Sequence, residues 1–177
     1  MRIALEEVRP VIWRRLLVPG SVRLNRLHEM LNTAMGWTDY HLHQFRVDGA
    51  LYGMQFDEYP EEELDEAAFT VIGAVGKVRR FFYDYDFGDD WNHEVVVEDV
   101  SSWPWGLKHA VCLGGERACP PEDVGGVPGF EEFLEVLADP DHEDHERMVV
   151  WSGGDYDPES FSLVGTNIAL QRLRVRG

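Results

Sequence analysis

The hydrophobic positions of this chain mostly alternate in its first two thirds and recur at helical spacing in its last third. Short alternating or apolar runs bounded by Gly, Pro and Asp are typical of strands. Strands are therefore expected over residues 2–8, 12–18, 41–47, 50–54, 81–87, 90–98 and 108–113. The Asp48-Gly49 pair predicts a type I′ turn between two of them. Residues 69–78 fit either a strand or a short helix.

One helix is predicted in the N-terminal half. Residues 24–35 place leucines and a methionine at helical spacing, and Gly36 fits the position just beyond a helix end. His28 lies on or near this apolar face. A histidine in that position is expected to pack in the core.

The C-terminal third is predicted to be helical, with helices over residues 130–137 and 142–151. A final helix is expected to begin with Asp157 as its N-cap, and Tyr156 would pack against Phe161. Its core-facing residues are expected to be Val164, Ile168 and Leu173.

These elements define the expected fold class. A chain of 177 residues with 44% hydrophobic residues is long enough for one domain with a real core. We therefore predict a single α+β domain over residues 1–177. It would be a mostly antiparallel sheet with hairpins, packed against an N-terminal helix and a helical C-terminal third.

Residues 81–98 gather aspartates, a tryptophan and a histidine into one predicted hairpin. If residues 88–89 form a two-residue turn, four side chains share one face. They are Asp84, Asp86, Trp91 and His93, with Asp84 opposite His93. Cross-strand neighbours of this kind have Cβ atoms roughly 4.5–5.5 Å apart. Two carboxylates and an imidazole at that spacing suit a divalent metal ion or an acid–base pair.

The roles in such a site follow from the side chains. Asp84 and Asp86 would hold the metal, His93 would relay a proton, and Asp89 or Asp90 would complete the set. A three-residue turn would instead shift the pairing by one and place His93 on the opposite face. The structural alternative is a hairpin whose Asp and Asn side chains bond to the local backbone.

Residues 114–129 are rich in Gly and Pro and predict a long irregular segment, which in a compact domain is often functional. The stiff Pro120-Pro121 pair would present Glu122 and Asp123 as an exposed acidic corner. The candidate binding residues are therefore Trp91, Asp89, Asp90, Glu122 and Asp123.

Two further sets of side chains are candidate metal ligands. Cys112 and Cys119 are spaced C-x6-C, which differs from the C-x2-C of zinc ribbons, so they are less favoured and expected to be reduced thiols. His41 and His43 share one face of a predicted strand with Phe45. The aromatic neighbour favours a half-buried structural face over a metal site.

The formal net charge of −17 argues against broad nucleic-acid binding, which requires Lys and Arg to neutralise phosphates, and against adsorption to anionic membranes. Residues 57–66 carry seven carboxylates in ten residues, and such an acidic run is typical of a solvated loop. No apolar run reaches the length of a membrane span, and residues 1–7 lack the apolar core of a signal peptide. We therefore expect a cytoplasmic protein.

Several motifs occur together in a fixed order. They are Pro10–Arg15, Met35–Trp37 followed by His41–Phe45, Tyr83–Trp91, and Cys119–Gly126. Together they resemble the plasmid Ri open-reading-frame-three-like family, also described as a transposon passenger (TnpR-like) family. The resemblance spans nearly the whole chain. It implies one α+β domain, found on plasmids, transposons and prokaryotic chromosomes, and it implies no established activity.

The sequence leaves different classes of function open. The first is an acidic cytoplasmic protein-interaction module of plasmids or mobile elements, with a basic protein as its partner. The alternative is a metal-dependent hydrolase that uses Asp84, Asp86 and His93. No cofactor is indicated apart from this divalent metal ion. The least favoured is nucleic-acid binding through Arg14-Arg15, Arg79-Arg80 and the C-terminal arginines.

Overall fold

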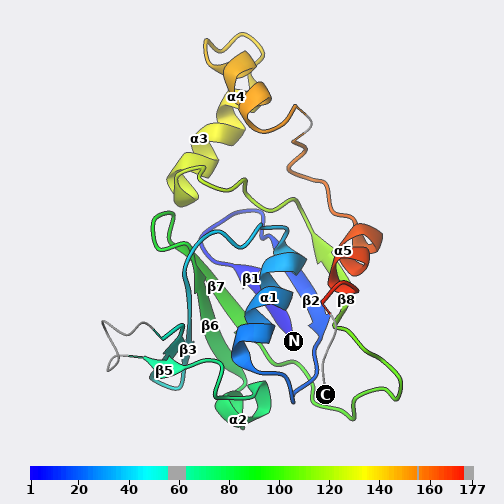
Figure 1. The fold of residues 1–177 in the computed structure, drawn as a ribbon. Coiled ribbons are helices and arrows are strands. Elements are labelled where there is room, and N and C mark those ends of the chain that lie inside the picture. The colour runs from blue at the N-terminus through cyan, green and yellow to red at the C-terminus, as the bar shows by residue number, and fades with distance from the viewer. Residues whose placement is uncertain (56–62, 155, 174–177) are drawn as a thin grey trace.

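An eight-stranded sheet runs through the computed structural model, which describes residues 1–55, 63–154 and 156–173 (Figure 1). Its strands are β1 (Arg2–Leu5), β2 (Trp13–Leu17), β3 (His43–Val47), β4 (Ala50–Gly53), β5 (Leu64–Asp65), β6 (Arg80–Tyr85), β7 (Trp91–Val96) and β8 (Val111–Glu116). They lie in the order β5-β4-β3-β6-β7-β1-β2-β8. Neighbours are antiparallel, apart from β5, which joins β4 in parallel.

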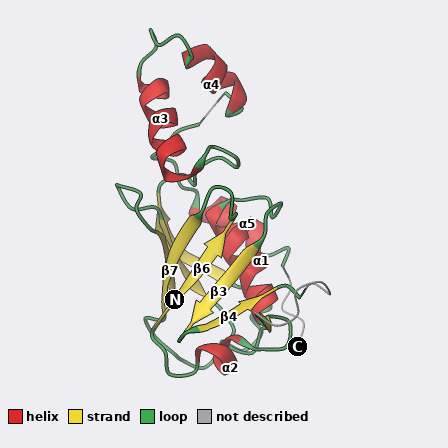
Figure 2. Ribbon diagram, turned by 90° about the vertical axis from the view of Figure 1, so that its left-hand side faces the viewer, coloured by secondary structure: helices red, strands yellow, loops and turns green. Residues whose placement is uncertain are grey.

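The helices in the described residues are α1 (Leu24–Met35), α2 (Val71–Val75), α3 (Gly126–Ala138), α4 (His145–Trp151) and α5 (Leu163–Leu170). α1 crosses one face of the sheet and α2 lies at one end of it (Figure 1). α3 and α4 project beyond the opposite end (Figure 2). These elements confirm the predicted α+β class, with a mostly antiparallel sheet, an N-terminal helix and a helical last third.

The core lies between α1 and the sheet. Successive side chains of a strand point to opposite faces, so alternate residues of β6 and β7 face α1. Phe81, Tyr83 and Tyr85 of β6 are buried there, as are Trp91 and Val95 of β7. The histidines described below pack against this aromatic layer.

Two local predictions are confirmed. α1 buries its leucines and ends at Gly36, whose φ of 113° is the left-handed cap conformation that glycine favours. The β3–β4 hairpin turns at Asp48 and Gly49, with φ of 50° and 82°, as a type I′ turn requires. Within residues 69–78, which fitted either element, Val71–Val75 form the short helix α2.

Residues 126–151, here called the helical arm, project from the sheet (Figures 1 and 2). The segment predicted to be irregular over residues 114–129 is partly regular, because β8 continues to Glu116 and α3 begins at Gly126. The two chain segments at the base of the arm are tied together. The Ala118 N–H donates to Pro158 O at 3.0 Å, and the Tyr156 hydroxyl donates to Cys119 O at 3.2 Å.

The final helix differs from its prediction. α5 begins after Ser162, whose hydroxyl accepts the Gly165 N–H at 3.0 Å, so Asp157 is not its N-cap. Tyr156 packs instead against the phenylalanines of α3, with a ring-centroid distance of 5.1 Å to Phe133.

The face that α5 buries was also predicted wrongly in part. Val164 and Ile168 are 71% and 52% exposed, whereas Leu170 is buried. Asn167 fixes this rotation of the helix, because its amide bonds to both the N–H and the carbonyl of Cys112 at 2.9 Å. Leu173 packs partly buried against the core, as predicted. Arg174 and Arg176 lie outside the described residues.

Candidate functional site

The register of the acidic hairpin differs from the one that the predicted site required. β6 and β7 pair Tyr85 with Trp91, Asp84 with Asn92 and Tyr83 with His93. The turn therefore spans residues 86–90. A shift of one residue moves every side chain of the second strand to the other face. The predicted pairing of Asp84 with His93 is wrong.

Asp86 explains the longer turn. Its carboxylate accepts the N–H groups of Gly88 and Asp89 at 3.0 and 3.3 Å, and its carbonyl accepts the Asp90 N–H at 2.6 Å. Asp86 and Asp90 both have a φ of 57°, a left-handed conformation that Asp tolerates better than most residues. The structural alternative, local bonding of the turn aspartates, is thus realised at Asp86.

The register separates the predicted catalytic residues. His93 is fully buried on the α1 side, where its Nδ1–H donates to Tyr83 O at 3.0 Å. Burial lowers the pKa of His93 to about 4, so the imidazole is neutral at neutral pH. Asp84 lies on the other face and forms an ion pair with Arg46 at 2.6 Å. The structure therefore does not assemble Asp84, Asp86 and His93 into one site.

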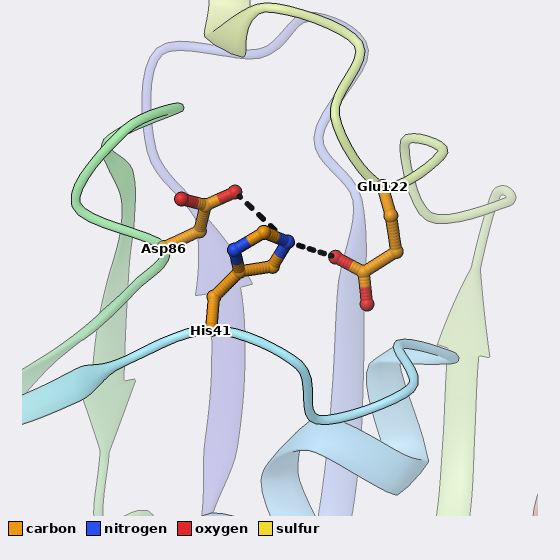
Figure 3. Close-up of side chains that lie close together, drawn as sticks. All are labelled: His41, Asp86 and Glu122. Atoms are coloured by element: carbon orange, nitrogen blue, oxygen red, sulfur yellow. Dashed lines mark ion pairs between the residues drawn. The ribbon is translucent and has the colours of Figure 1, made fainter.

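Asp86 joins a different group, here called the His41 cluster: His41, Asp86 and Glu122 (Figure 3). His41 Nε2 lies 3.5 Å from Asp86 Oδ2 and 3.7 Å from Glu122 Oε2. Asp123 Oδ1 is 3.4 Å from the same nitrogen. Together with Asp123, the cluster thus places three carboxylates around one imidazole.

Three separate segments position the His41 cluster. His41 precedes β3 and Asp86 follows β6. Because these strands are antiparallel neighbours, the two residues meet at the same end of the strand pair. The Asp86 N–H donates to Leu42 O at 2.9 Å and fixes this junction. Glu122 comes from the segment between β8 and α3.

Hydrogen bonds hold Glu122 inward. Its Oε1 accepts the N–H and hydroxyl of Thr38 at 2.8 and 3.0 Å and the Tyr85 hydroxyl at 3.2 Å. Trp37 Nε1 donates to Pro120 O at 3.0 Å, which anchors the diproline segment. The predicted acidic corner is therefore split: the Glu122 side chain is 19% exposed and the Asp123 side chain 76%.

The other predicted binding residues serve the fold. Asp89 Oδ2 accepts the Gly125 N–H at 3.0 Å and thereby connects the hairpin turn to the start of the helical arm. Asp90 accepts a hydrogen bond from the Asn92 side chain. Trp91 is fully buried, packed between Trp37 and the helical arm, and is not accessible from the surface.

Cys112 and Cys119 are free thiols, as predicted. Burial raises the pKa of both above the usual thiol value. Metal ligation requires the thiolate, which such burial disfavours. In the described part of the chain the His41 cluster is the convergent group with metal-ligand geometry, and it contains neither cysteine.

Beside the His41 cluster is a pocket of about 620 Å³, here called the histidine pocket, and His41 lines it. At its inner wall the rings of His28 from α1 and His43 from β3 stack with centroids 3.4 Å apart and planes 2° apart. His28 Nε2 lies 2.6 Å from Asp39 Oδ1, and His43 Nε2 lies 2.8 Å from Glu66 Oε2. Each imidazole thus has its own carboxylate.

The protonation of His28 follows from its neighbours. Burial raises the pKa of Tyr83 well above its usual value, so its hydroxyl keeps its proton and donates to His28 Nδ1 at 2.7 Å. Nε2 then carries the imidazole proton and donates a hydrogen bond to Asp39. Burial, with the charge of His43, lowers the pKa of His28 to about 4, so the ring is neutral at neutral pH.

Sequence reasoning missed this pocket. His28 was expected in the core, and it is buried, but its hydrogen bonds reach a pocket. Glu66 belongs to the acidic run that predicted a solvated loop, yet it is 3% exposed. No local pattern marks Glu66, because only the parallel pairing of β4 with β5 brings it to His43.

The fold and these sites define an α+β protein with an acid–imidazole cluster beside a histidine-lined pocket. The chain belongs to the plasmid pRiA4b ORF-3-like protein family, which it matches over residues 1–164, and this confirms the resemblance seen in its motifs.

Relatives span almost the whole chain. It is 38% identical to the uncharacterized protein y4hQ of Sinorhizobium fredii, over 99% of this chain and 92% of that protein. The crystal structure of the protein of unknown function MM3350 from Methanosarcina mazei Go1 matches with a TM-score of 0.83 and 35% identity, over 93% of each chain. Within the described residues, no helix has the length and apolar character to cross a membrane.

Proposed function

We propose that the protein is a metal-dependent hydrolase whose divalent cation is held by His41, Asp86 and Glu122. The observation that carries this proposal is the separation of the three donor atoms. Ligands of a tetrahedral ion with bonds of about 2.1 Å lie roughly 3.4 Å apart. Asp86 Oδ2 and Glu122 Oε2 lie 3.5 and 3.7 Å from His41 Nε2, which is close to that value.

The donor types support the same conclusion. One imidazole nitrogen and two carboxylate oxygens suit Zn²⁺ or Mn²⁺. Three protein ligands leave a coordination position for water, which such an ion activates for attack on a carbonyl or phosphoryl group. The bonds from Thr38 and Tyr85 orient Glu122, as outer residues commonly orient metal ligands.

Metal analysis of the purified protein tests this proposal. Chelator-stripped protein is titrated with Zn²⁺ or Mn²⁺ and the bound metal is measured by elemental mass spectrometry. We expect close to one ion per chain, lost in His41→Ala and in Asp86→Asn. Asp84→Asn is the matched control, because Asp84 lies on the opposite face and should leave metal binding intact.

Either of two results would contradict the metal site: no binding at saturating metal, or equal binding in all three variants. Metal-loaded protein is then assayed against chromogenic esters, amides and phosphate esters. Turnover that requires His41 and Asp86 but not Asp84 would support the hydrolase. Full metal occupancy without turnover of any ester, amide or phosphate ester would restrict the proposal to metal binding.

A second candidate function is the cytoplasmic protein-interaction module of plasmids or mobile elements, and the helical arm favours it. Arg147 is the sole Arg or Lys of residues 126–151. The arm is otherwise acidic, through Glu131, Glu132, Glu135, Asp139, Asp141, Glu143, Asp144 and Glu146. It projects from the sheet and exposes 74% of Val150 and 46% of Trp151 (Figure 2).

Such a surface fits a basic protein partner through charge complementarity. A variant with the acidic residues of the helical arm changed to Asn and Gln should then lose capture of the partner, and high salt should have the same effect on the parent protein. Capture that survives both changes would contradict this second function.

A further inference from the structure

A groove, here called the arm groove, is formed by α3, α4 and the segment that precedes them. The two helices lie side by side, and the His145 Nδ1–H donates to Val136 O at 3.0 Å between them (Figures 1 and 2). The groove has a volume of about 240 Å³. Pockets that enclose a whole small molecule usually hold about 300–1,000 Å³. The arm groove therefore has the size for one side chain of a larger ligand.

The walls of the arm groove are apolar. They include Val124, Phe133, Met148 and Trp151. Trp151 stands edge-on to the buried ring of Phe133, with ring centroids 5.6 Å apart, and it remains half-exposed itself. Tryptophan is enriched among the residues that dominate binding energy at protein interfaces, where it packs around apolar anchors. The walls therefore suit an apolar side chain of a polypeptide.

The rim of the arm groove is acidic. Asp123 and Glu132 line the groove, and both are exposed. Arg147 lines it as well, but Arg147 Nε lies 2.8 Å from Asp144 Oδ1, so this charge is already paired. Carboxylates around an apolar recess favour a polypeptide that carries Lys or Arg beside an apolar residue, and they repel the phosphates of nucleic acids.

The arm groove and the His41 cluster meet at Asp123. This residue lines the groove, and its Oδ1 lies 3.4 Å from His41 Nε2. A divalent ion at the cluster would not reverse the charge at this end of the groove, because it would lie among the carboxylates of Asp86, Glu122 and Asp123. A polypeptide held in the groove would therefore pass directly beside the metal site.

We propose that the arm groove holds an apolar side chain of a polypeptide substrate, that flanking Lys or Arg residues face Asp123 and Glu132, and that the same polypeptide extends to the His41 cluster. This inference rests on the proposed function, because the metal ion of the cluster supplies the chemistry. The reaction is hydrolysis of a peptide bond. The C–N bond breaks, and water gives its hydroxyl group to the carbonyl carbon and its remaining proton to the amine.

Binding is tested on the full chain without metal, by fluorescence anisotropy of the labelled peptide Gly-Lys-Lys-Leu-Lys-Lys-Gly. We expect saturable binding, weakened about tenfold or more when Ser replaces the Leu or Glu replaces each Lys. Trp151→Ala and Glu132→Lys should each weaken binding about tenfold. Val150→Ala and Glu131→Lys are the matched controls, because they change exposed neighbours outside the groove lining.

The controls should change binding by less than about twofold at physiological salt, where distant charges are screened. Far-UV circular dichroism shows whether each variant keeps its helices. If Trp151→Ala loses them, Glu132→Lys still tests the groove, because Glu132 is exposed. Cleavage is then tested on metal-loaded protein with a peptide library that keeps Leu flanked by Lys and randomises the residues on either side. Mass spectrometry should show cleavage at a fixed distance from the Leu, lost in Asp86→Asn.

The inference is overturned if the peptide does not bind, if the Ser or Glu peptides bind equally well, or if the groove variants and their controls lose binding equally. Metal-loaded protein that binds the peptide but cleaves no member of the library would also overturn it. The two proposals fail separately. Groove-dependent peptide binding without metal binding would refute the hydrolase and support the arm groove as a peptide site. Metal binding with turnover of small esters or amides, but without peptide binding, would refute the arm groove and support the hydrolase.

Discussion

Acidification should destabilise this protein through His93. The imidazole is fully buried in the aromatic layer, where Nδ1–H donates to Tyr83 O and Nε2 has no partner among the described residues. A second proton would place a charge on Nε2 without an acceptor. Burial also removes the water that would stabilise the charged ring, and this desolvation lowers the pKa of His93 from 6.5 to about 4.

The magnitude follows from proton linkage. Below pH 6.5 the unfolded chain binds a proton that native His93 accepts only near pH 4, so the free energy of unfolding falls as the pH is lowered through that window. Between pH 7 and 4.5 the loss from one such histidine is about 2 kcal/mol. His28, whose pKa is also lowered by burial, adds a loss of the same sign. A loss of this size is a substantial part of the stability of many domains, about 5 kcal/mol or more.

Urea unfolding at several pH values, followed by tryptophan fluorescence, measures this effect. His93→Phe should reduce the pH slope of stability between pH 6.5 and 4.5 by about half, whatever it does to absolute stability. His142→Gln is the matched control, because His142 is exposed and should leave the slope unchanged. A stability that is flat from pH 7 to 4.5, or an unchanged slope in His93→Phe, would refute the reasoning.

Three further outcomes are expected. Gly126→Ala should lower the free energy of unfolding in urea by at least about 1 kcal/mol more than Gly153→Ala does. Both glycines have a positive φ, but a Cβ at Gly126 would lie 2.4 Å from Asp89 O, whereas a Cβ at Gly153 would meet no atom within 4 Å. Equal costs would contradict this contact. Asp84→Asn should change stability by less than about 1 kcal/mol, since it weakens an ion pair whose Arg46 side chain is 40% exposed, and a larger loss would show a role beyond that pair. Cys119 should react with a thiol reagent at pH 8 only after unfolding, because burial raises its pKa; rapid labelling of native protein would count against that.

The elements that local sequence dictates were predictable. The leucines of residues 24–35 and the glycine after them specify α1 and its end, and Asp48-Gly49 specifies a hairpin turn. Both rest on interactions within a few residues. The hairpin at residues 81–98 was recognised as well. Its register, however, depends on Asp86, whose carboxylate and carbonyl oxygens accept three N–H groups of its own turn. The Gly88-Asp89 pair by itself does not indicate this longer turn or the register that it sets.

The candidate site was predictable only in part. Asp86 and Glu122 were singled out from local motifs, but the residue that joins them, His41, was interpreted as part of a structural face. Their meeting depends on the antiparallel pairing of β3 with β6 and on the Trp37–Pro120 hydrogen bond. Contacts of this kind are set by tertiary structure, and no pattern along one segment encodes them.

The closed base of the helical arm has a consequence for how this protein can diversify. Ala118 and Pro158 are already joined by a 3.0 Å hydrogen bond, so a tight turn between them could replace everything in between without re-registering β8 or displacing α5. Glu122 lies inside that replaceable segment, whereas His41 and Asp86 lie outside it. A descendant that lost the arm at this junction would keep the sheet, the histidine pocket and two of the three cluster residues, and would lose the third in the same event.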